Sequence, residues 1–153
     1  MGVTGDKSKK PSAANSPLPP EEIIFFIDRS LGRKVIPGAL QKAGERVKAH
    51  DDLYPQDTKD PVWLRGVGEQ GWVVLTKDKR IRHRNLELEA LMNAKVRAFV
   101  LASKGDLQGQ EMAEIFIKAL PAMKRLLTQT PGPFIANVNR EGKVALVKGG
   151  KLK

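Results

Sequence analysis

Short apolar runs alternate with helical patterns from about residue 21 to residue 147. Continuous apolar runs of four to six residues are typical of strands buried on both faces, and apolar residues at helical spacing between them predict crossover helices. This alternation indicates an α/β domain with a mostly parallel sheet and right-handed crossovers. The expected strands are 23–27, 46–49, 72–76 and 97–102, and the expected helices are 37–43, 60–70, 86–94 and 108–128.

Two further segments near the end of the pattern predict a β-hairpin at the edge of the sheet. Residues 133–138 and 143–147 are strand-like, and residues 139–142 join them through a glycine-containing turn. Earlier in the chain, Asp60-Pro61 looks like a helix cap with proline at the first helical position, and Gly71 ends the same helix. Pro121 should kink or restart the long helix.

The 153 residues suit one domain with a sizeable core. Residues 1–20 are rich in Ser, Pro, Gly and Lys, so we expect a disordered basic tail there. The domain is expected over residues 21–147, and residues 148–153 form a short basic tail.

The chain carries 27 Lys and Arg against 17 Asp and Glu, a net charge of +10. This surplus favours a polyanionic partner such as nucleic acid, although a basic surface can also serve solubility alone. Cysteine is absent, which excludes disulfides and Cys-ligated zinc. With no apolar run long enough to span a bilayer, we expect a soluble, cytoplasmic protein without a membrane partner.

Acidic residues follow or open several of the predicted elements. Asp28 and Asp78 come just after two buried strands, and Asp60 opens a helix. Because the carboxyl ends of parallel strands meet at one edge of a sheet, these carboxylates should converge there and bind a divalent cation. Each also has a simpler interpretation, as a turn residue or a helix cap. Asp52 is a further candidate, and its neighbours Asp51 and Asp57 stay open.

A basic run surrounds Asp78 at the end of the third strand. At this edge of the sheet, lysine and arginine side chains would hold backbone phosphates, the alternative being a solvated charged face. Tyr54, in the acidic segment, is the best candidate for stacking on a base. The candidate phosphate-binding residues are Lys77, Lys79, Arg80, Arg82 and Arg84.

Other reaction classes fit the sequence less well. There is no cysteine nucleophile, and His50 and His83 lack the spacing of a catalytic triad. Glycine-rich phosphate loops are missing from the strand-to-helix turns. A phosphatase with an aspartyl nucleophile at Asp28 would need a second aspartate at the position that Ser30 occupies.

The order of these motifs resembles PIN-like domain proteins, in particular the VapC-type toxins of toxin–antitoxin pairs. The resemblance covers residues 23 to about 147 and rests chiefly on the helix opened by Asp60 and on the Val-Leu-Thr-Lys-Asp-Lys segment that contains Asp78. It implies a three-layer α/β/α sandwich whose acids bind Mg²⁺ or Mn²⁺ and hydrolyse RNA. Matched by motif, the metal ligands are Asp28, Asp60 and Asp78, with Asp52 as a fourth catalytic acid.

The leading hypothesis is therefore a metal-dependent endoribonuclease that hydrolyses RNA phosphodiester bonds. The resemblance implies a cognate antitoxin as protein partner, and a homodimer is compatible with the sequence. The alternative hypothesis is a catalytically silent PIN-like module that binds nucleic acid or an acidic protein through its charge. Hard oxygen ligands favour Mg²⁺ or Mn²⁺ over zinc.

Overall fold

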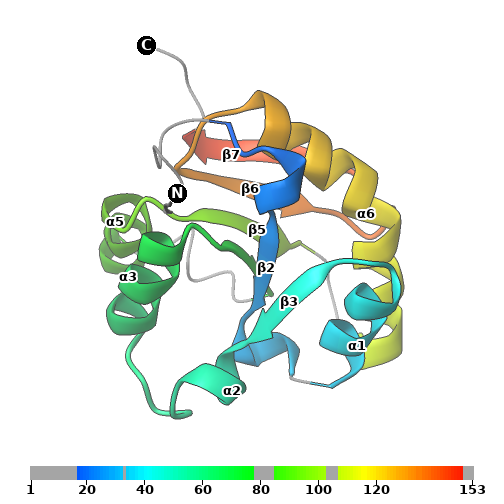
Figure 1. The fold of residues 1–153 in the computed structure, drawn as a ribbon, viewed down its shortest axis with the longest axis horizontal. Helices are drawn as coiled ribbons and strands as arrows, with labels where there is room; N and C mark the ends of the chain where they lie inside the picture. The colour runs from blue at the N-terminus through cyan, green and yellow to red at the C-terminus, as the bar shows by residue number, and fades with distance from the viewer. Residues whose placement is uncertain (1–16, 33, 78–84, 103–106, 150–153) are drawn as a thin grey trace, which may run out of the picture.

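The computed structural model describes residues 17–32, 34–77, 85–102 and 107–149, and for Asp60 and residues 85–88 it describes the backbone alone. Helices and strands alternate along most of this range, as the apolar pattern predicts (Figure 1). The elements are η2 (Pro20–Glu22), β2 (Ile24–Ile27), η3 (Arg29–Leu31), α1 (Val35–Lys42), β3 (Arg46–Ala49), α2 (His50–Leu53), α3 (Asp60–Gln70), β4 (Val73–Thr76), α5 (Asn85–Asn93), β5 (Arg97–Leu101), α6 (Gly109–Gln129), β6 (Phe134–Val138) and β7 (Val144–Gly149).

The six strands form one sheet in the order β3-β2-β4-β5-β6-β7. All neighbouring pairs are parallel except β6 and β7, which form an antiparallel hairpin with a register shift at Ile135/Ala136. The predicted mostly parallel sheet with a C-terminal hairpin is therefore confirmed.

Helices cover both faces of the sheet, which gives the predicted three layers. In Figure 1, α1 and α6 lie to the right of the sheet, and α3 and α5 lie to the left. Each pair of helices encloses its own apolar core, because successive strand residues point to opposite faces. Phe25 and Ile27 of β2 enter the core under α1 and α6, whereas Phe26 enters the core under α3 and α5.

Three local features differ from the expectations. Lys59, and not Asp60, is the N-cap of α3, so Asp60 and Pro61 are its first two helical residues. Pro121 does not break α6, because it lies on the exposed side, where solvent can satisfy the carbonyl that loses its partner. The acidic segment after β3 is not a plain loop, since residues His50–Leu53 form one helical turn.

Described residues on both sides of the expected domain limits, 21 and 147, take part in the fold. Leu18, within the expected tail, is buried, and its backbone N–H donates to the carbonyl of Leu127 at 2.8 Å. At the other end β7 continues to Gly149.

Arg97 is the first residue of β5 and is buried. Burial lowers the pKa of the Arg97 guanidinium, and the Glu22 carboxylate opposes that shift. No helix in the described ranges is long and apolar enough to cross a membrane.

Candidate active site

The connections after β2 and β4 leave the sheet on opposite sides. From β2 the chain passes to α1, which packs in one core, and the next helix after β4 is α5, which packs in the other. Because β2 and β4 are neighbours, the carboxyl ends of these two strands mark the switch point at the sheet edge where open α/β sheets bind ligands. In Figure 1 this edge of the sheet lies at the bottom, beside α2.

Asp28 is the first residue after β2 and lies at this switch point. The register that pairs Ile27 with Leu75 places Asp28 beside Thr76, and the Asp28 N–H donates to the Leu75 carbonyl at 2.9 Å. Asp28 is the N-cap of η3, and its side chain accepts a hydrogen bond from the N–H of Ser30. It is only 7% exposed, so the two central strands hold the carboxylate in a largely buried position.

Two hydroxyl groups fix the orientation of the Asp28 carboxylate. Thr76 Oγ1 and Ser30 Oγ each donate to Asp28 Oδ2 at 2.7 Å, and the Ser30 N–H adds a longer contact of 3.4 Å. The Lys77 N–H in turn donates to Ser30 Oγ at 3.2 Å. All of these bonds to the carboxylate end on Oδ2, whereas Oδ1 makes no hydrogen bond to any described residue. One oxygen is thus anchored to the fold by neutral donors.

A second connection joins Asp28 to the acidic segment between β3 and α3. Ala49 pairs with Ile27, so α2 begins at the same edge of the sheet as Asp28. Arg29, adjacent to Asp28, donates from Nη1 to the carbonyl of Gln56 in the α2–α3 loop. This contact ties the loop that leads into Asp60 to the end of β2.

The structure locates part of the predicted site. Asp28 is buried and Asp52 is exposed on α2, and Lys77 is exposed directly after β4. The side chain of Asp60 lies outside the described part, although its backbone opens α3. Within the described residues, no three His, Cys, Asp or Glu side chains are grouped closely enough to hold a metal ion. The predicted residues that lie wholly outside the description are Asp78, Lys79, Arg80, Arg82 and Arg84.

An aromatic cluster beside the candidate site contains a buried histidine that the sequence did not single out. His50 is 2% exposed and packs edge-on against Phe26 and Trp63. Its Nδ1 lies 3.1 Å from Asp51 Oδ1. Tyr54 belongs to the same cluster, with its ring against Phe26 and its hydroxyl over Gly66, which has no room for a Cβ. The Tyr54 ring packs against Phe26 and is partly exposed, so its stacking on a base stays a prediction.

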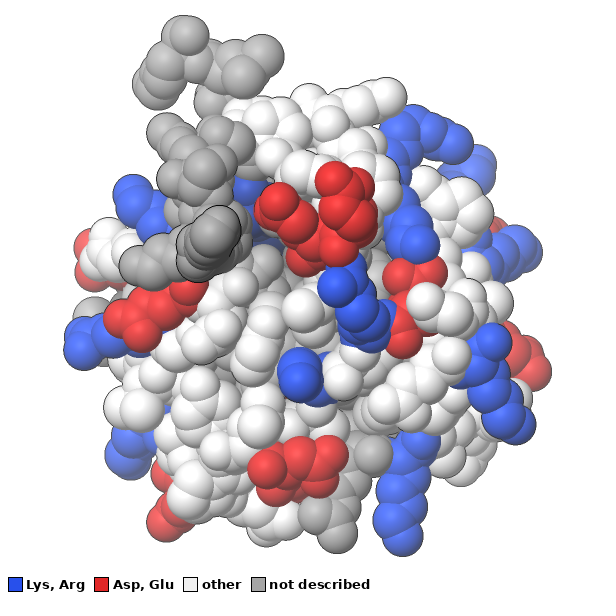
Figure 2. Space-filling view, in the orientation of Figure 1, with Lys and Arg blue, Asp and Glu red and all other residues white. Residues whose placement is uncertain are grey.

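On the face that Figure 2 shows, the described lysine and arginine side chains do not gather in one patch. Figure 2 shows lysine and arginine side chains scattered over the face that carries β3, with acidic side chains between them. Lys48, on β3, places its ammonium 5.8 Å from the centre of the Trp72 ring. The basic run expected to bind phosphate lies mostly outside the description, so its arrangement stays a prediction.

Comparison with known proteins identifies the fold. Residues 23–103 match the family model described as a PIN-like domain. The chain belongs to the PIN-like domain family. The matched range begins at the strand that ends in Asp28 and includes the segments that carry Asp52, Asp60 and Asp78.

One curated relative of this PIN-like chain is the Mycobacterium tuberculosis H37Rv protein named "Putative ribonuclease VapC45". The two are 31% identical over 119 residues, which cover 75% of this chain and 85% of the relative. No solved structure matches the chain. The resemblance drawn from the sequence, to the VapC-type branch of the PIN-like proteins, is thereby confirmed.

Proposed function

We propose that this PIN-like protein is a metal-dependent endoribonuclease that hydrolyses RNA phosphodiester bonds and acts as the toxin of a toxin–antitoxin pair. The observation that carries the proposal is the buried Asp28 carboxylate at the carboxyl ends of β2 and β4, with one oxygen held by two hydroxyls. Membership of the family and the ribonuclease name of the mycobacterial relative support it.

The donor chemistry of the site fits a hard divalent cation. Asp28 supplies an anionic oxygen that neutral hydroxyls orient without neutralising its charge. Carboxylate oxygens of this kind suit Mg²⁺ or Mn²⁺. In our proposal Asp60 and Asp78 are the other ligands and Asp52 is a fourth catalytic acid. When bound, the cation would lower the pKa of a coordinated water and neutralise charge on the phosphate.

The residues of the chain itself would bind and orient the RNA strand. Lys77 is exposed directly after β4 at this edge of the sheet, and we expect Lys79, Arg80, Arg82 and Arg84 to continue a line of phosphate contacts. Ser30 and Thr76 would keep Asp28 in one orientation during turnover. We also propose that a cognate antitoxin covers this edge of the sheet.

The deciding experiment compares the purified wild-type protein with Asp28→Asn on a mixed RNA pool. Asparagine keeps the size of the side chain and one oxygen for the two hydroxyls, but it removes the charge that attracts a cation. We expect cleavage by the wild type with Mg²⁺ or Mn²⁺, none with chelator, and a loss of at least about a hundredfold in the variant.

Glu69→Gln is the matched control, because Glu69 is an exposed acid in the last turn of α3, at the opposite end of that helix from Asp60. It should cleave like the wild type. Cleavage that persists in chelator or in Asp28→Asn would refute the metal-dependent mechanism. If the wild type binds RNA and cleaves none of it under any metal condition, the silent binding module becomes the better description.

A further inference from the structure

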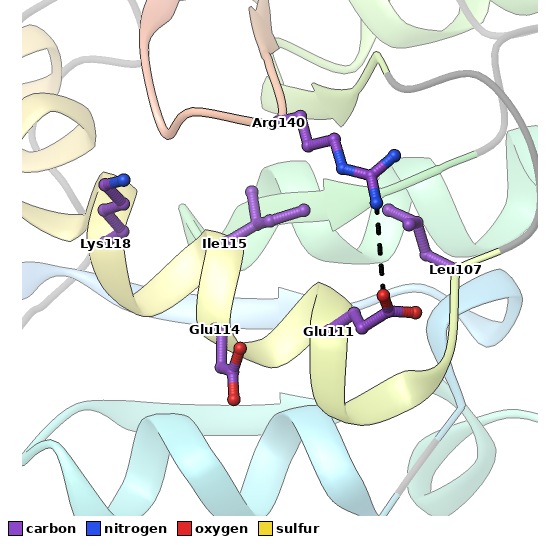
Figure 3. A pocket seen from close by; sticks show the side chains of 6 residues that line it. All are labelled: Leu107, Glu111, Glu114, Ile115, Lys118 and Arg140. Carbon is purple, nitrogen blue, oxygen red and sulfur yellow. Dashed lines mark ion pairs between the residues drawn. The ribbon is translucent and has the colours of Figure 1, made fainter.

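A pocket of about 290 Å³ lies between the first half of α6 and the turn that joins β6 to β7. Its floor is apolar, because Ile115 is 7% exposed and Leu107 packs against the same core. Charged side chains surround this floor: Figure 3 shows Arg140 reaching from the turn toward Glu111 on the helix, with Lys118 further along α6. The remaining lining residue is Glu114.

The fold holds Glu111 in a defined orientation. Glu111 is the third helical residue of α6, and its Oε1 accepts a hydrogen bond of 2.8 Å from the N–H of Gln108, as part of a capping box. With that oxygen engaged, the other oxygen, Oε2, is the one directed at Arg140. The capping box therefore fixes the Glu111 side chain so that Oε2 is the acceptor atom available in the pocket.

The turn that carries Arg140 is also well fixed. Asn139 Oδ1 accepts from the N–H groups of Glu141 at 3.0 Å and Lys143 at 2.9 Å. Gly142 has a positive φ of 83° and packs closely on the Lys118 side chain. Arg140 is thus held on a rigid turn opposite Glu111.

Arg140 and Glu111 face each other across the pocket but do not form a hydrogen bond. Arg140 Nη2 lies 4.0 Å from Glu111 Oε2, which is longer than a hydrogen bond. Both side chains are about half exposed, at 58% and 48%, so the direct ion pair contributes little. The Arg140 guanidinium can therefore donate, and Glu111 Oε2 can accept, hydrogen bonds with a ligand that lies on the apolar floor of the pocket.

The pocket opens at the same edge of the sheet as Asp28. β2, β4, β5 and β6 are all parallel, so Arg140, which follows β6, lies at the carboxyl edge that begins with Asp28 after β2. Three strand spacings separate β2 from β6, or about 14 Å. A single-stranded RNA bound at Asp28 and running along this edge would bring a nucleotide a short way from the scissile bond to the pocket.

We infer that this pocket is a guanine subsite for the RNA substrate, an inference that rests on the proposed function. Around its adjoining Hoogsteen and Watson–Crick edges, guanine offers the acceptors N7 and O6 followed by the donors N1–H and N2–H₂. The Arg140 fork would donate to N7 and O6, which is the commonest specific contact of arginine with a base, while Glu111 Oε2 accepts from N1–H and N2–H₂. Adenine, cytosine and uracil lack this succession of two acceptors and two donors.

The other lining residues complete the match. The aliphatic surfaces of Leu107 and Ile115 would contact the face of the base. Lys118, on the side of the pocket away from the Glu111 oxygen, would contact the phosphate of the same nucleotide. A phosphate placed beside Glu111 or Glu114 would be repelled, which orients the base edge toward the carboxylate.

The direct test uses nucleotide monophosphates as probes, with the full-length protein in chelator so that no cleavage is involved. Backbone amide shifts in NMR titrations with GMP, IMP, AMP, CMP and UMP would give both the site and the affinity. We expect shifts around Glu111, Ile115 and Arg140, and GMP binding at least about tenfold tighter than AMP, CMP and UMP. IMP, which lacks the N2 amine, should be intermediate.

Two conservative variants examine the two contacts. Glu111→Gln keeps the capping box, because glutamine serves in it equally well, and Arg140→Lys keeps the charge but loses the fork. Each should weaken GMP binding about tenfold and leave the circular dichroism spectrum and the melting temperature unchanged. The matched controls are Glu141→Gln and Arg125→Lys, both exposed and outside the pocket, which should bind like the wild type.

Several results would overturn the inference. These are equal binding of all five nucleotides, shifts confined to other surfaces, and unchanged GMP binding in both pocket variants. Tighter binding of N-acetylarginine amide than of GMP would also overturn it, because the carboxylates would then suit a basic side chain of a protein partner.

A cleavage experiment separates this inference from the proposed function. Sequencing the products of a mixed RNA pool should show guanine enriched at one fixed position relative to the cut, and Glu111→Gln should flatten that enrichment. Asp28→Asn should lose cleavage and keep GMP binding. GMP binding without any cleavage by the wild type would remove the ribonuclease proposal and leave the pocket, whereas cleavage with no guanine preference would remove the subsite alone.

Discussion

Asp28 is stabilised by neutral hydroxyl donors and not by a described cation. Hydrogen bonds from Ser30 and Thr76 hold the carboxylate in one orientation, while its net charge remains available to a ligand. A salt bridge to arginine at the same position would compete with a metal ion. This arrangement is compatible with the cation binding that we propose.

The variant Thr76→Val should show how much the orientation of the Asp28 carboxylate matters for cleavage, because it leaves the charge of Asp28 in place. Valine has nearly the shape of threonine but cannot donate to Asp28 Oδ2, so the carboxylate gains freedom to rotate. Because partners of this kind typically change metal affinity or activity by about 10- to 100-fold, we expect RNA cleavage to fall within that range.

The measurement is the Mg²⁺ concentration needed for half-maximal cleavage, together with kcat and KM. Thr76→Ser restores the hydroxyl and should recover most of the activity. If valine and serine behave alike, or if only KM for RNA changes, Thr76 does not act through Asp28.

At the level of single residues, the sequence predicted positions better than contacts. Asp28 falls just beyond β2 as its apolar run indicates, since the pattern of buried residues determines where the strand ends. The hydroxyl partners were missed, because their approach to Asp28 depends on the register of β2 against β4. A serine two residues after Asp28 and a threonine as the last strand residue were the available signals. The burial of His50 likewise depends on neighbours distant in sequence.

At the level of elements, α3 lies very close to the end of α5 because residue 68 of α3 is a glycine. A Cβ placed on Gly68 would lie 1.9 Å from the carbonyl oxygen of Ala94, just beyond the end of α5. Backbone atoms leave little room for adjustment, so any larger residue must push the helix and this turn apart. Since Asp60 opens α3, the position of that helix also affects the candidate site.

Gly68→Ala should therefore destabilise the protein although alanine favours helices. We expect a loss of about 1–3 kcal/mol in the free energy of unfolding, the usual cost of overpacking. Gly38→Ala in α1 is the matched control, because a Cβ there meets nothing within 4 Å. It should raise stability by about 1 kcal/mol. Urea denaturation followed by circular dichroism measures both, and equal effects of the two variants would contradict the packing argument.

The elements themselves were largely predictable, and the exceptions have identifiable causes. Buried strands such as β4 and β5 read as uninterrupted apolar runs, and Gly71 ends α3 with a positive φ of 75°. Whether Pro121 interrupts α6 depends on which side of the helix faces solvent, and this is set by packing. The one-turn helix α2 is too short to produce a period in the sequence.

At the scale of the whole molecule, the charge of +10 should make RNA binding strongly dependent on salt. We predict that replacing Lys79, Arg80, Arg82 and Arg84 by glutamine reduces the slope of log K against log salt by about 0.7 for each phosphate that the protein no longer neutralises. Fluorescence anisotropy with a single-stranded RNA in chelator measures this slope.

The matched control removes the same amount of charge elsewhere. Lys42, Arg125, Lys143 and Lys148 are exposed, and their replacement by glutamine lowers the net charge equally. If the control flattens the slope as much as the first set, binding follows the overall charge, and the basic run is an ordinary solvated face.

The hydrogen bond from the Asp28 N–H to the Leu75 carbonyl also bears on how the site moves. It lies between β2 and β4, whose residues are almost all buried and which have paired strands on both sides. Such amides exchange with deuterium only when the whole domain opens, whereas short exposed elements such as α2 exchange through local fraying. Native-state hydrogen exchange should thus give the Asp28 amide the protection of global unfolding. Asp28 would then keep a fixed position in the candidate site while α2, which carries Asp52, frays locally.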